Sequence, residues 1–216
     1  MTTALIHRTL SVGLLAAFSV GIAGCSDTVR EGRSPAYLIV QRLEAASGAE
    51  DDQFSDELSS DVLTNGTVFE DLARVTLRLG LRDIGAVGSP TSPTTNNFVT
   101  VNRYTVAFRR TDGRNTPGVD VPYGFEGAGS VTVTDSDTTM SFVIVRTQAK
   151  VESPLKDLTG GGAVRTISTI ADITFYGRDQ VGNDVSITGS ISVNFSDWGD
   201  PDGGTEEPEP EPEPEV

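Results

Sequence analysis

Residues 184–195 read Asp-Val-Ser-Ile-Thr-Gly-Ser-Ile-Ser-Val-Asn-Phe, a segment in which apolar and polar side chains alternate. One parity holds the apolar set, and Ser, Thr and Asn occupy the other; the apolar residues are Val185, Ile187, Ile191, Val193 and Phe195. Successive side chains of a β-strand point to opposite faces, so a period of two predicts a strand with one buried and one polar face. Gly189 interrupts the apolar set, which predicts a bulge or a close contact at that point.

Six further segments carry the same alternation or a dense run of β-branched and aromatic residues, and we expect each to contain a strand. They are residues 36–46, 74–82, 98–110, 130–134, 139–151 and 165–177. The first also admits a short helix, and the segment 139–151 is apolar on both faces, which predicts a central strand. Acidic or Gly- and Pro-rich stretches predict loops at 47–60, 85–97 and 111–127. Seven or so strands without a strong helical pattern predict an all-β fold, an antiparallel β-sandwich.

The turn between the last two predicted strands carries a motif. Residues 179–183 read Asp-Gln-Val-Gly-Asn, and Gly and Asn accept a positive φ in turns. With its flanking strands, this turn resembles the last hairpin of bacterial Ig-like domains, which implies an Ig-like β-sandwich and no particular activity. The paired cysteines of antibody domains are absent from the sequence, and Trp198 follows the last predicted strand.

The first 25 residues have the organisation of an export signal. A short polar start with two basic side chains precedes a mostly apolar run over 10–23, and Gly24 and Cys25 follow. A positive start, a short apolar middle and small residues before the cut describe a secretory signal. The apolar run is shorter than the about 20 residues that a membrane-spanning helix needs. The sequence therefore predicts a signal peptide over residues 1–24.

Residues 22–25, Ile-Ala-Gly-Cys, resemble the lipobox of bacterial lipoproteins, with Ile22 where leucine is commoner. The resemblance implies a diacylglycerol thioether on Cys25, cleavage before it and acylation of the new amino group. Two or three acyl chains anchor a protein durably, whereas one binds marginally. An ordinary signal peptide beside a chance cysteine is the alternative, but Cys25 is the only cysteine of the chain.

Ser26 follows the cysteine, and an aspartate comes only at Asp27. By resemblance to the sorting pattern of enterobacterial lipoproteins, this order implies the outer membrane rather than the inner membrane. The chain as a whole is similar to uncharacterised Ig-like lipoproteins of environmental bacteria, and this likeness implies no activity.

The composition excludes several classes of function. The formal net charge of −15 argues against nucleic-acid binding, which depends on Lys and Arg neutralising phosphates. His7 is the only histidine, so a processed chain lipidated on Cys25 would keep neither a free thiol nor a histidine. This excludes Ser-His-Asp and Cys-His nucleophile systems, and zinc or haem sites built on these side chains. We therefore expect no enzyme activity, no cofactor and no resident metal.

Three regions follow the signal. Residues 25–35 read as a lipidated start and a polar tether, residues 36–199 as the folded domain, and residues 200–216 as an acidic tail. Alternating Glu and Pro fill 207–215, and because proline favours polyproline II while the glutamates repel, this stretch is expected to be extended. The tail is expected to be disordered and solvated, with a spacer or a docking segment for a basic partner as the alternatives.

Several acidic residues are candidate ion or catalytic groups: Asp135, Asp137, Asp197, Asp200, Asp202, Glu70, Glu126 and Glu152. Loop aspartates offer oxygen ligands for Ca²⁺, but neither Asp group has the spacing of a calcium loop with a closing glutamate, so turn formation is the expected role. A glycoside hydrolase would need two acids about 5–10 Å apart, for which the three glutamates are the candidates.

The densest basic patch combines Arg109, Arg110, Asp112 and Arg114 at a strand end. We expect local salt bridges there, with an anion or partner contact as the alternative. Tyr123 and Phe125 lie in the following predicted loop. Loops on a rigid sandwich often bind ligands, yet we expect both rings to fold back onto the core.

These observations favour a membrane-anchored, non-catalytic binding or assembly module of the cell envelope, with an unidentified protein partner. A carbohydrate-binding or carbohydrate-active surface lipoprotein is the alternative. A sugar site predicts a groove with two or more exposed aromatic rings or paired buried carboxylates. An assembly module predicts a flat, polar surface or an available sheet edge. A purely structural spacer is a third, weaker hypothesis.

Overall fold

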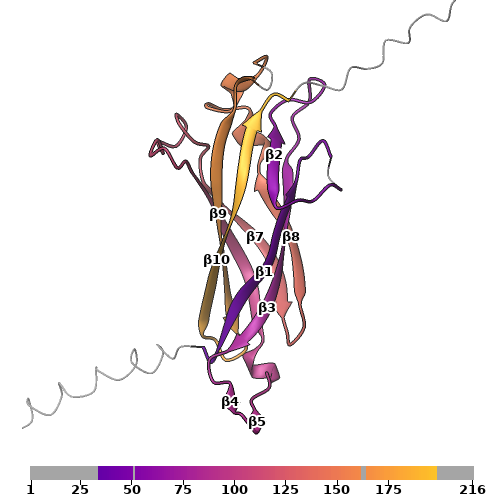
Figure 1. Ribbon diagram of the computed structural model, residues 1–216, viewed down its shortest axis with the longest axis vertical. Helices are drawn as coiled ribbons and strands as arrows, with labels where there is room; N and C mark the ends of the chain where they lie inside the picture. The colour runs from indigo at the N-terminus through magenta and orange to yellow at the C-terminus, as the bar shows by residue number, and fades with distance from the viewer. Residues whose placement is uncertain (1–33, 51, 162–163, 199–216) are drawn as a thin grey trace, which may run out of the picture.

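The computed structural model describes residues 34–50, 52–161 and 164–198. Two β-sheets packed face to face form the body of the domain, and a separate two-stranded sheet projects from one end (Figure 1). The predicted signal peptide, Cys25, the acidic tail over 200–216 and nearly all of the tether lie outside the described residues. The all-β class predicted from the sequence is confirmed.

The smaller sheet has three strands in the order β1-β3-β8. These are β1 (Ala36–Ala46), β3 (Asp71–Leu81) and β8 (Thr138–Val145). Both neighbouring pairs are antiparallel. The segment 36–46 is therefore a strand and not a helix.

The larger sheet has five strands in the order β2-β10-β9-β6-β7. These are β2 (Glu57–Asp61), β10 (Asp184–Ser196), β9 (Ile167–Asp179), β6 (Val99–Arg109) and β7 (Phe125–Val133). The pairs of β10 with β9, β9 with β6 and β6 with β7 are antiparallel, whereas β2 lies parallel to β10. That pair departs from the purely antiparallel sandwich predicted.

This strand order is that of Ig-like sandwiches. In those domains strands A, B and E share one sheet, while C, F and G share the other with an optional C′ strand. Here β1, β3 and β8 take the places of A, B and E, and β6, β7, β9 and β10 take those of C, C′, F and G. The Ig-like arrangement follows from this correspondence, and β2 extends the larger sheet beyond β10.

The core follows the alternation read from the sequence. On β10, Val185, Ile191, Val193 and Phe195 are buried, whereas Ser186, Ser190 and Ser192 of the other parity are exposed. Gly189 lies on the inward-facing side of β10. A Cβ at this position would lie 3.3 Å from the Leu43 side chain of β1, so the close approach of the two strands accounts for glycine here. Three rings from both sheets meet at the centre, with Phe142 lying 5.0 Å from Tyr104 and 5.3 Å from Phe175 between ring centroids.

Three predictions about single segments are wrong. The segment 47–60 is not a loop throughout, because β2 begins at Glu57. The strand predicted at 130–134 begins earlier, at Phe125, so Phe125 belongs to β7 and not to a loop. Strand β8 lies at an edge of its sheet and not at its centre. The apolar side chains on its other face are nevertheless shielded from solvent, because Val143 is half-buried and Val145 is buried.

The remaining elements are short. Between β3 and β6 lie β4 (Gly85–Ala86), β5 (Ser89–Pro90) and the 3₁₀ turn η1 (Thr95–Asn97). Between β8 and β9 lie α2 (Thr147–Lys150) and the 3₁₀ turn η2 (Lys156–Leu158). Within the described ranges, no helix has the length and apolar character to cross a bilayer.

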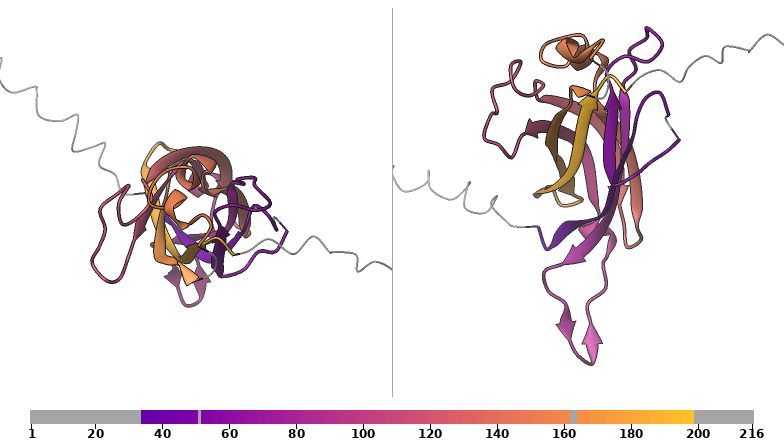
Figure 2. Two further views of the ribbon diagram at one scale, coloured as in Figure 1. Left: turned by 90° about the horizontal axis from the view of Figure 1, so that it is seen from above. Right: turned by 45° about the horizontal axis from the view of Figure 1, so that its top comes forward.

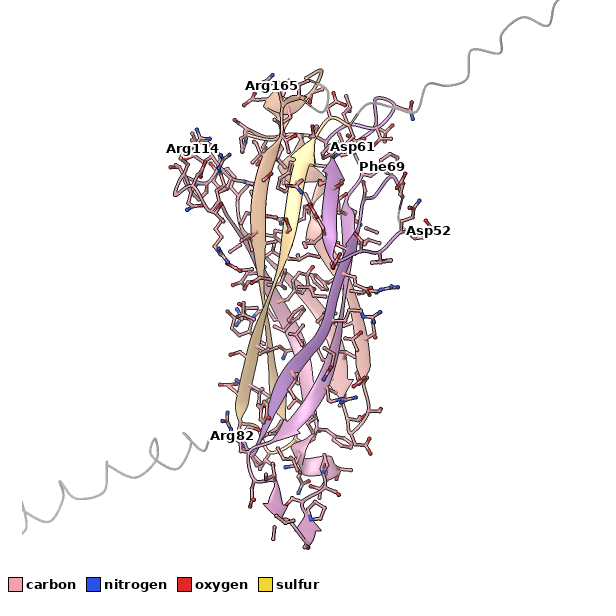
Figure 3. All side chains as sticks on the ribbon, in the orientation of Figure 1. Asp52, Asp61, Phe69, Arg82, Arg114 and Arg165 are labelled. Carbon is pink, nitrogen blue, oxygen red and sulfur yellow. The ribbon has the colours of Figure 1, made fainter. Side chains whose placement is uncertain are left out.

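The first and last described residues lie at opposite ends of the sandwich. The Arg82 guanidinium donates to the Ser34 carbonyl oxygen at 3.0 Å, and Arg82 lies at the lower end in Figure 3. The Trp198 amide donates to Asp61 Oδ1 at 3.1 Å, and Asp61 lies at the upper end. The chain therefore enters the domain at one end and leaves it at the other.

Candidate functional site

The outer face of the five-stranded sheet is rich in hydroxyl groups. The outward positions of β10 from Ser186 to Asn194 are Ser, Thr and Asn, and those of β6, β7 and β9 include several threonines. Two pairs of threonine hydroxyls hydrogen-bond across neighbouring strands, Thr100 with Thr132 at 3.0 Å and Thr174 with Thr188 at 2.8 Å. The side chains thus make a polar surface tied laterally from strand to strand.

A β-bulge in β6 shapes a groove in this face. The register shifts between Val101 and Arg103 against both neighbouring strands. The extra residue places Asn102 and Arg103 side by side on the exposed face, although alternation would turn one of them inward. Opposite the bulge stands Gly177, where a Cβ would lie 2.5 Å from the Thr100 carbonyl oxygen. The bulge therefore requires glycine at this position.

The groove has a volume of about 490 Å³. Its lining comes from β6, β9 and β10: Asn102, Arg103, Tyr176, Gly177, Arg178, Asp184, Val185 and Ser186. The Arg103 guanidinium lies 4.2 Å from the centroid of the Tyr176 ring and pairs with Glu126 at 3.2 Å. Arg178 pairs with Asp184 at 2.7 Å. The groove therefore holds two arginines, each paired with a carboxylate, beside one half-buried aromatic ring.

A second polar cluster lies on the same face. Arg109 Nε donates to Asp172 Oδ2 at 2.6 Å, and Ser190 Oγ donates to Asp172 Oδ1 at 2.6 Å. Partial burial opposes ionisation of Asp172, but the hydrogen bonds from Arg109 and Ser190 prevail and lower the pKa of its carboxyl group. Asp172 is therefore charged and fixed in position at neutral pH.

The predicted basic patch separates into two parts. Arg109 belongs to the sheet face, whereas Arg110 and Arg114 both contact Asp112 in the loop after β6. Their hydrogen bonds, with that from Arg110 the strongest, hold the pKa of Asp112 well below its ordinary value. This loop stands away from the sandwich on one side (Figure 2). The local salt bridges predicted from the sequence are confirmed.

The two aromatic residues of the same region differ. Phe125 is half-buried: its ring lies 6.3 Å from that of Tyr104 and beneath the Arg146 guanidinium at 4.2 Å. Tyr123 remains 55 % exposed. The prediction that both rings return to the core is therefore right for Phe125 and wrong for Tyr123.

The candidate aspartates that the structure describes take part in separate local contacts. Asp137 pairs with Arg78 at 2.7 Å, and Asp197 accepts the Gly160 amide at 2.6 Å. Asp200 and Asp202 lie outside the described residues. Among the described residues, no group of three or more His, Cys, Asp or Glu side chains is placed to hold a metal ion.

The three candidate glutamates occupy separate elements. Glu126 lies on β7 and pairs with Arg103, Glu152 follows α2 and accepts a hydrogen bond from Gln148, and Glu70 directly precedes β3. Each glutamate therefore lies on a different part of the chain, and Glu126 is held by its pair with Arg103.

The structure contains a buried ionic cluster around Asp71 and Lys150 that the sequence pattern does not indicate. Lys150 Nζ lies 2.8 Å from Asp71 Oδ1 and donates to the Asp61 carbonyl oxygen at 2.7 Å. Ser60 Oγ and the Gly48 amide also donate to the Asp71 carboxylate, at 2.6 Å and 2.9 Å. Burial raises the pKa of Asp71, and the Lys150 charge and these hydrogen bonds oppose that shift. The cluster joins β2, β3 and α2 and is sealed from solvent, so it is a structural centre.

The Asp-x-x-Gly-Asn turn is organised by its aspartate. Asp179 Oδ1 accepts the Val181 and Asn183 amides at 3.0 Å and 2.9 Å, and Asn183 Nδ2 donates to Asp179 Oδ2 at 2.7 Å. Gly182 takes the positive φ of 98°, while Asn183 does not. The predicted hairpin turn is confirmed, with only its glycine in the left-handed region.

Comparison with protein-family models, with curated proteins and with solved structures finds no match to this chain.

Proposed function

We propose that this protein is a lipid-anchored, non-catalytic contact module of the bacterial cell envelope, held in the outer membrane through Cys25. The hydroxyl-rich outer face of the five-stranded sheet, with the groove around Arg103 and Tyr176, is its surface for a protein partner. The observation that carries the proposal is this face itself: a rigid, polar sheet surface whose charged side chains are held by hydrogen bonds.

The anchor rests on the sequence. The lipobox-like residues 22–25 supply the lipid attachment, and nine peptide units join Cys25 to Ser34 at the lower end of the domain. A fixed entry at one end leaves the sheet faces and the far end free for partners. The absence of any histidine beyond His7 and of any cysteine beyond Cys25 supports a role without nucleophilic catalysis.

The groove favours a protein partner over a sugar. Sugar sites use exposed aromatic platforms, and Tyr176 is the one aromatic residue of this groove. The Arg103 guanidinium already covers its ring. Arginine and tyrosine are residues enriched at protein interfaces, where their flat groups pack and donate hydrogen bonds. The adjacent edge strand β7 offers unpaired backbone groups as a second means of contact.

Site-specific photo-crosslinking in the native envelope tests this proposal. A photoreactive amino acid replaces Ser186 in the groove or Thr132 on β7, and a matched control replaces Ser141, which is exposed on the other sheet. We expect a discrete adduct from the first two positions and little from the control, and Arg103→Ala should lower the yield at Ser186. Equal adducts from both sheets, or none from the five-stranded sheet, would contradict the assigned face.

A further inference from the structure

A small two-stranded finger projects beyond the lower end of the sandwich. Strands β4 and β5 pair with each other, Gly85 with Pro90 and Ala86 with Ser89, and a turn at Val87 and Gly88 joins them (Figure 1). The Gly85 amide donates to Asp83 Oδ1 at 2.9 Å, and the Thr91 amide donates to the Ile84 carbonyl oxygen at 3.1 Å. These bonds give the finger a defined shape.

The finger carries exposed apolar side chains and no charge. Val87 at the tip is fully exposed, and Ile84 is 76 % exposed. From Ile84 to Asn102 the sequence has no Asp, Glu, Lys or Arg, although the whole chain is strongly acidic. Large apolar side chains held in water at the end of an ordered hairpin lower their free energy by entering an apolar phase.

The chain enters the domain at this same end. Ser34 accepts a hydrogen bond from Arg82, and only Asp83 separates Arg82 from the finger, which begins at Ile84. The first described residue and the base of the finger are therefore neighbours. Nine peptide units separate Cys25 from Ser34, and an extended chain covers at most about 3.6 Å per residue, or about 32 Å in all. By contrast, the 13 residues of β10 span about 40 Å from the lower end to the upper end.

The base of the finger suits the headgroup level of a bilayer. Tyr37 is 39 % exposed there, and the Arg82 guanidinium lies 5.9 Å from the centroid of its ring. Tyrosine is enriched at membrane interfaces, and arginine is attracted to lipid phosphates. At the other end of the molecule, Trp198 leads into the acidic tail, whose glutamates an anionic membrane would repel.

We propose that the finger is a membrane contact: Ile84 and Val87 insert into the leaflet that holds the Cys25 lipid, with Tyr37 and Arg82 at headgroup level. The inference rests on the proposed anchor. It also predicts how the domain is oriented on the membrane, because the lipid and the finger attach the same end of the domain to the bilayer. The domain then stands on the bilayer and its C-terminal end points away.

A fluorescent probe at the fingertip tests the contact. The lipidated full chain carrying Val87→Cys is labelled with a polarity-sensitive maleimide and reconstituted into phosphatidylethanolamine–phosphatidylglycerol vesicles. Because Cys25 is blocked by its lipid, the new thiol is the only reactive one. Val164→Cys is the matched control, since Val164 is 93 % exposed and neighbours Arg165 at the upper end (Figure 3).

We expect a blue shift of the emission at position 87 and quenching by brominated lipid, with neither effect at position 164. Adding Ile84→Asp should reduce both effects at position 87 without changing the fold, because Ile84 is exposed. Protein that floats with the vesicles while both probes report water would overturn the finger contact alone. Protein that fails to float would overturn the lipid anchor and the finger contact with it.

Discussion

Lys150 and Asp71 form an ion pair sealed inside the sandwich, with Nζ 2.8 Å from Oδ1 and side chains that are 1 % and 0 % exposed. The pair connects the start of β3 to the short helix that follows β8. Removing one partner leaves a buried charge without a counterion, whereas removing both leaves none, and this asymmetry governs the first prediction.

Lys150→Met is expected to lower the free energy of unfolding by about 3–5 kcal/mol, because Asp71 would stay buried without its counterion. Asp71→Asn together with Lys150→Met should cost less than the sum of the two single changes. Urea unfolding of the non-lipidated mature chain measures both. Lys156→Met, at an exposed lysine of the same segment, is the control and should change little. Strict additivity of the pair would show that the two charges are independent.

Gly177→Ala should destabilise the domain by about 1–3 kcal/mol, because the new Cβ would lie 2.5 Å from a backbone oxygen of the bulged strand β6. Gly88→Ala in the finger is the matched comparison, since a Cβ there meets nothing within 4 Å and its φ is not positive. That change should be neutral or stabilise by about 0.4–1 kcal/mol. Equal melting temperatures for the two variants would argue against the bulge as the reason for glycine at 177.

Acid should weaken the fold through Asp172 and Asp179. Both are partly desolvated, yet hydrogen bonds to their charged forms lower the pKa of each below the ordinary 3.8. Carboxyl groups with a lowered folded-state pKa stabilise the fold above the unfolded-state value, and that stability is lost as the pH falls through the folded-state value. The free energy of unfolding should therefore be level near neutrality and fall below pH 4, with a shallower fall in Asp179→Asn. An unchanged acid profile in that variant would contradict the assignment.

Deleting residues 200–216 should leave the melting temperature unchanged, because an alternating Glu-Pro segment offers no apolar surface to a core. Differential scanning calorimetry of the full mature chain and the shortened chain makes the comparison. A clear drop on deletion would show that the tail packs on the domain.

The sequence predicts the sandwich well because alternation records directly which side chains face inward. Val185, Val193 and Phe195 are buried as their parity requires. It does not predict β2, because that strand is short and only Leu58 of its two inward positions is apolar. The other is Ser60, a polar residue whose hydroxyl is satisfied by its hydrogen bond to Asp71. Likewise, Lys150 does not by itself indicate a buried ion pair, because its partner Asp71 is distant in the sequence.

The groove is hidden in the sequence for a similar reason. A bulge breaks the alternation of β6 at Asn102, and the one local trace is Gly177, which lies on a different strand. The finger illustrates the opposite case. Its Gly- and Pro-rich composition correctly indicates a connection between strands, but only the structure places it beside Ser34, at the end where the chain enters the domain.

The central claim, a contact module anchored through Cys25, is tested most directly by metabolic labelling with a clickable fatty acid in cells that express the chain or its Cys25→Ala variant. We predict that the wild-type chain is labelled and found with the outer membrane, and that Cys25→Ala is unlabelled and leaves that fraction. A wild-type chain without label, or a Cys25→Ala chain that keeps both the label and its membrane location, would contradict the account.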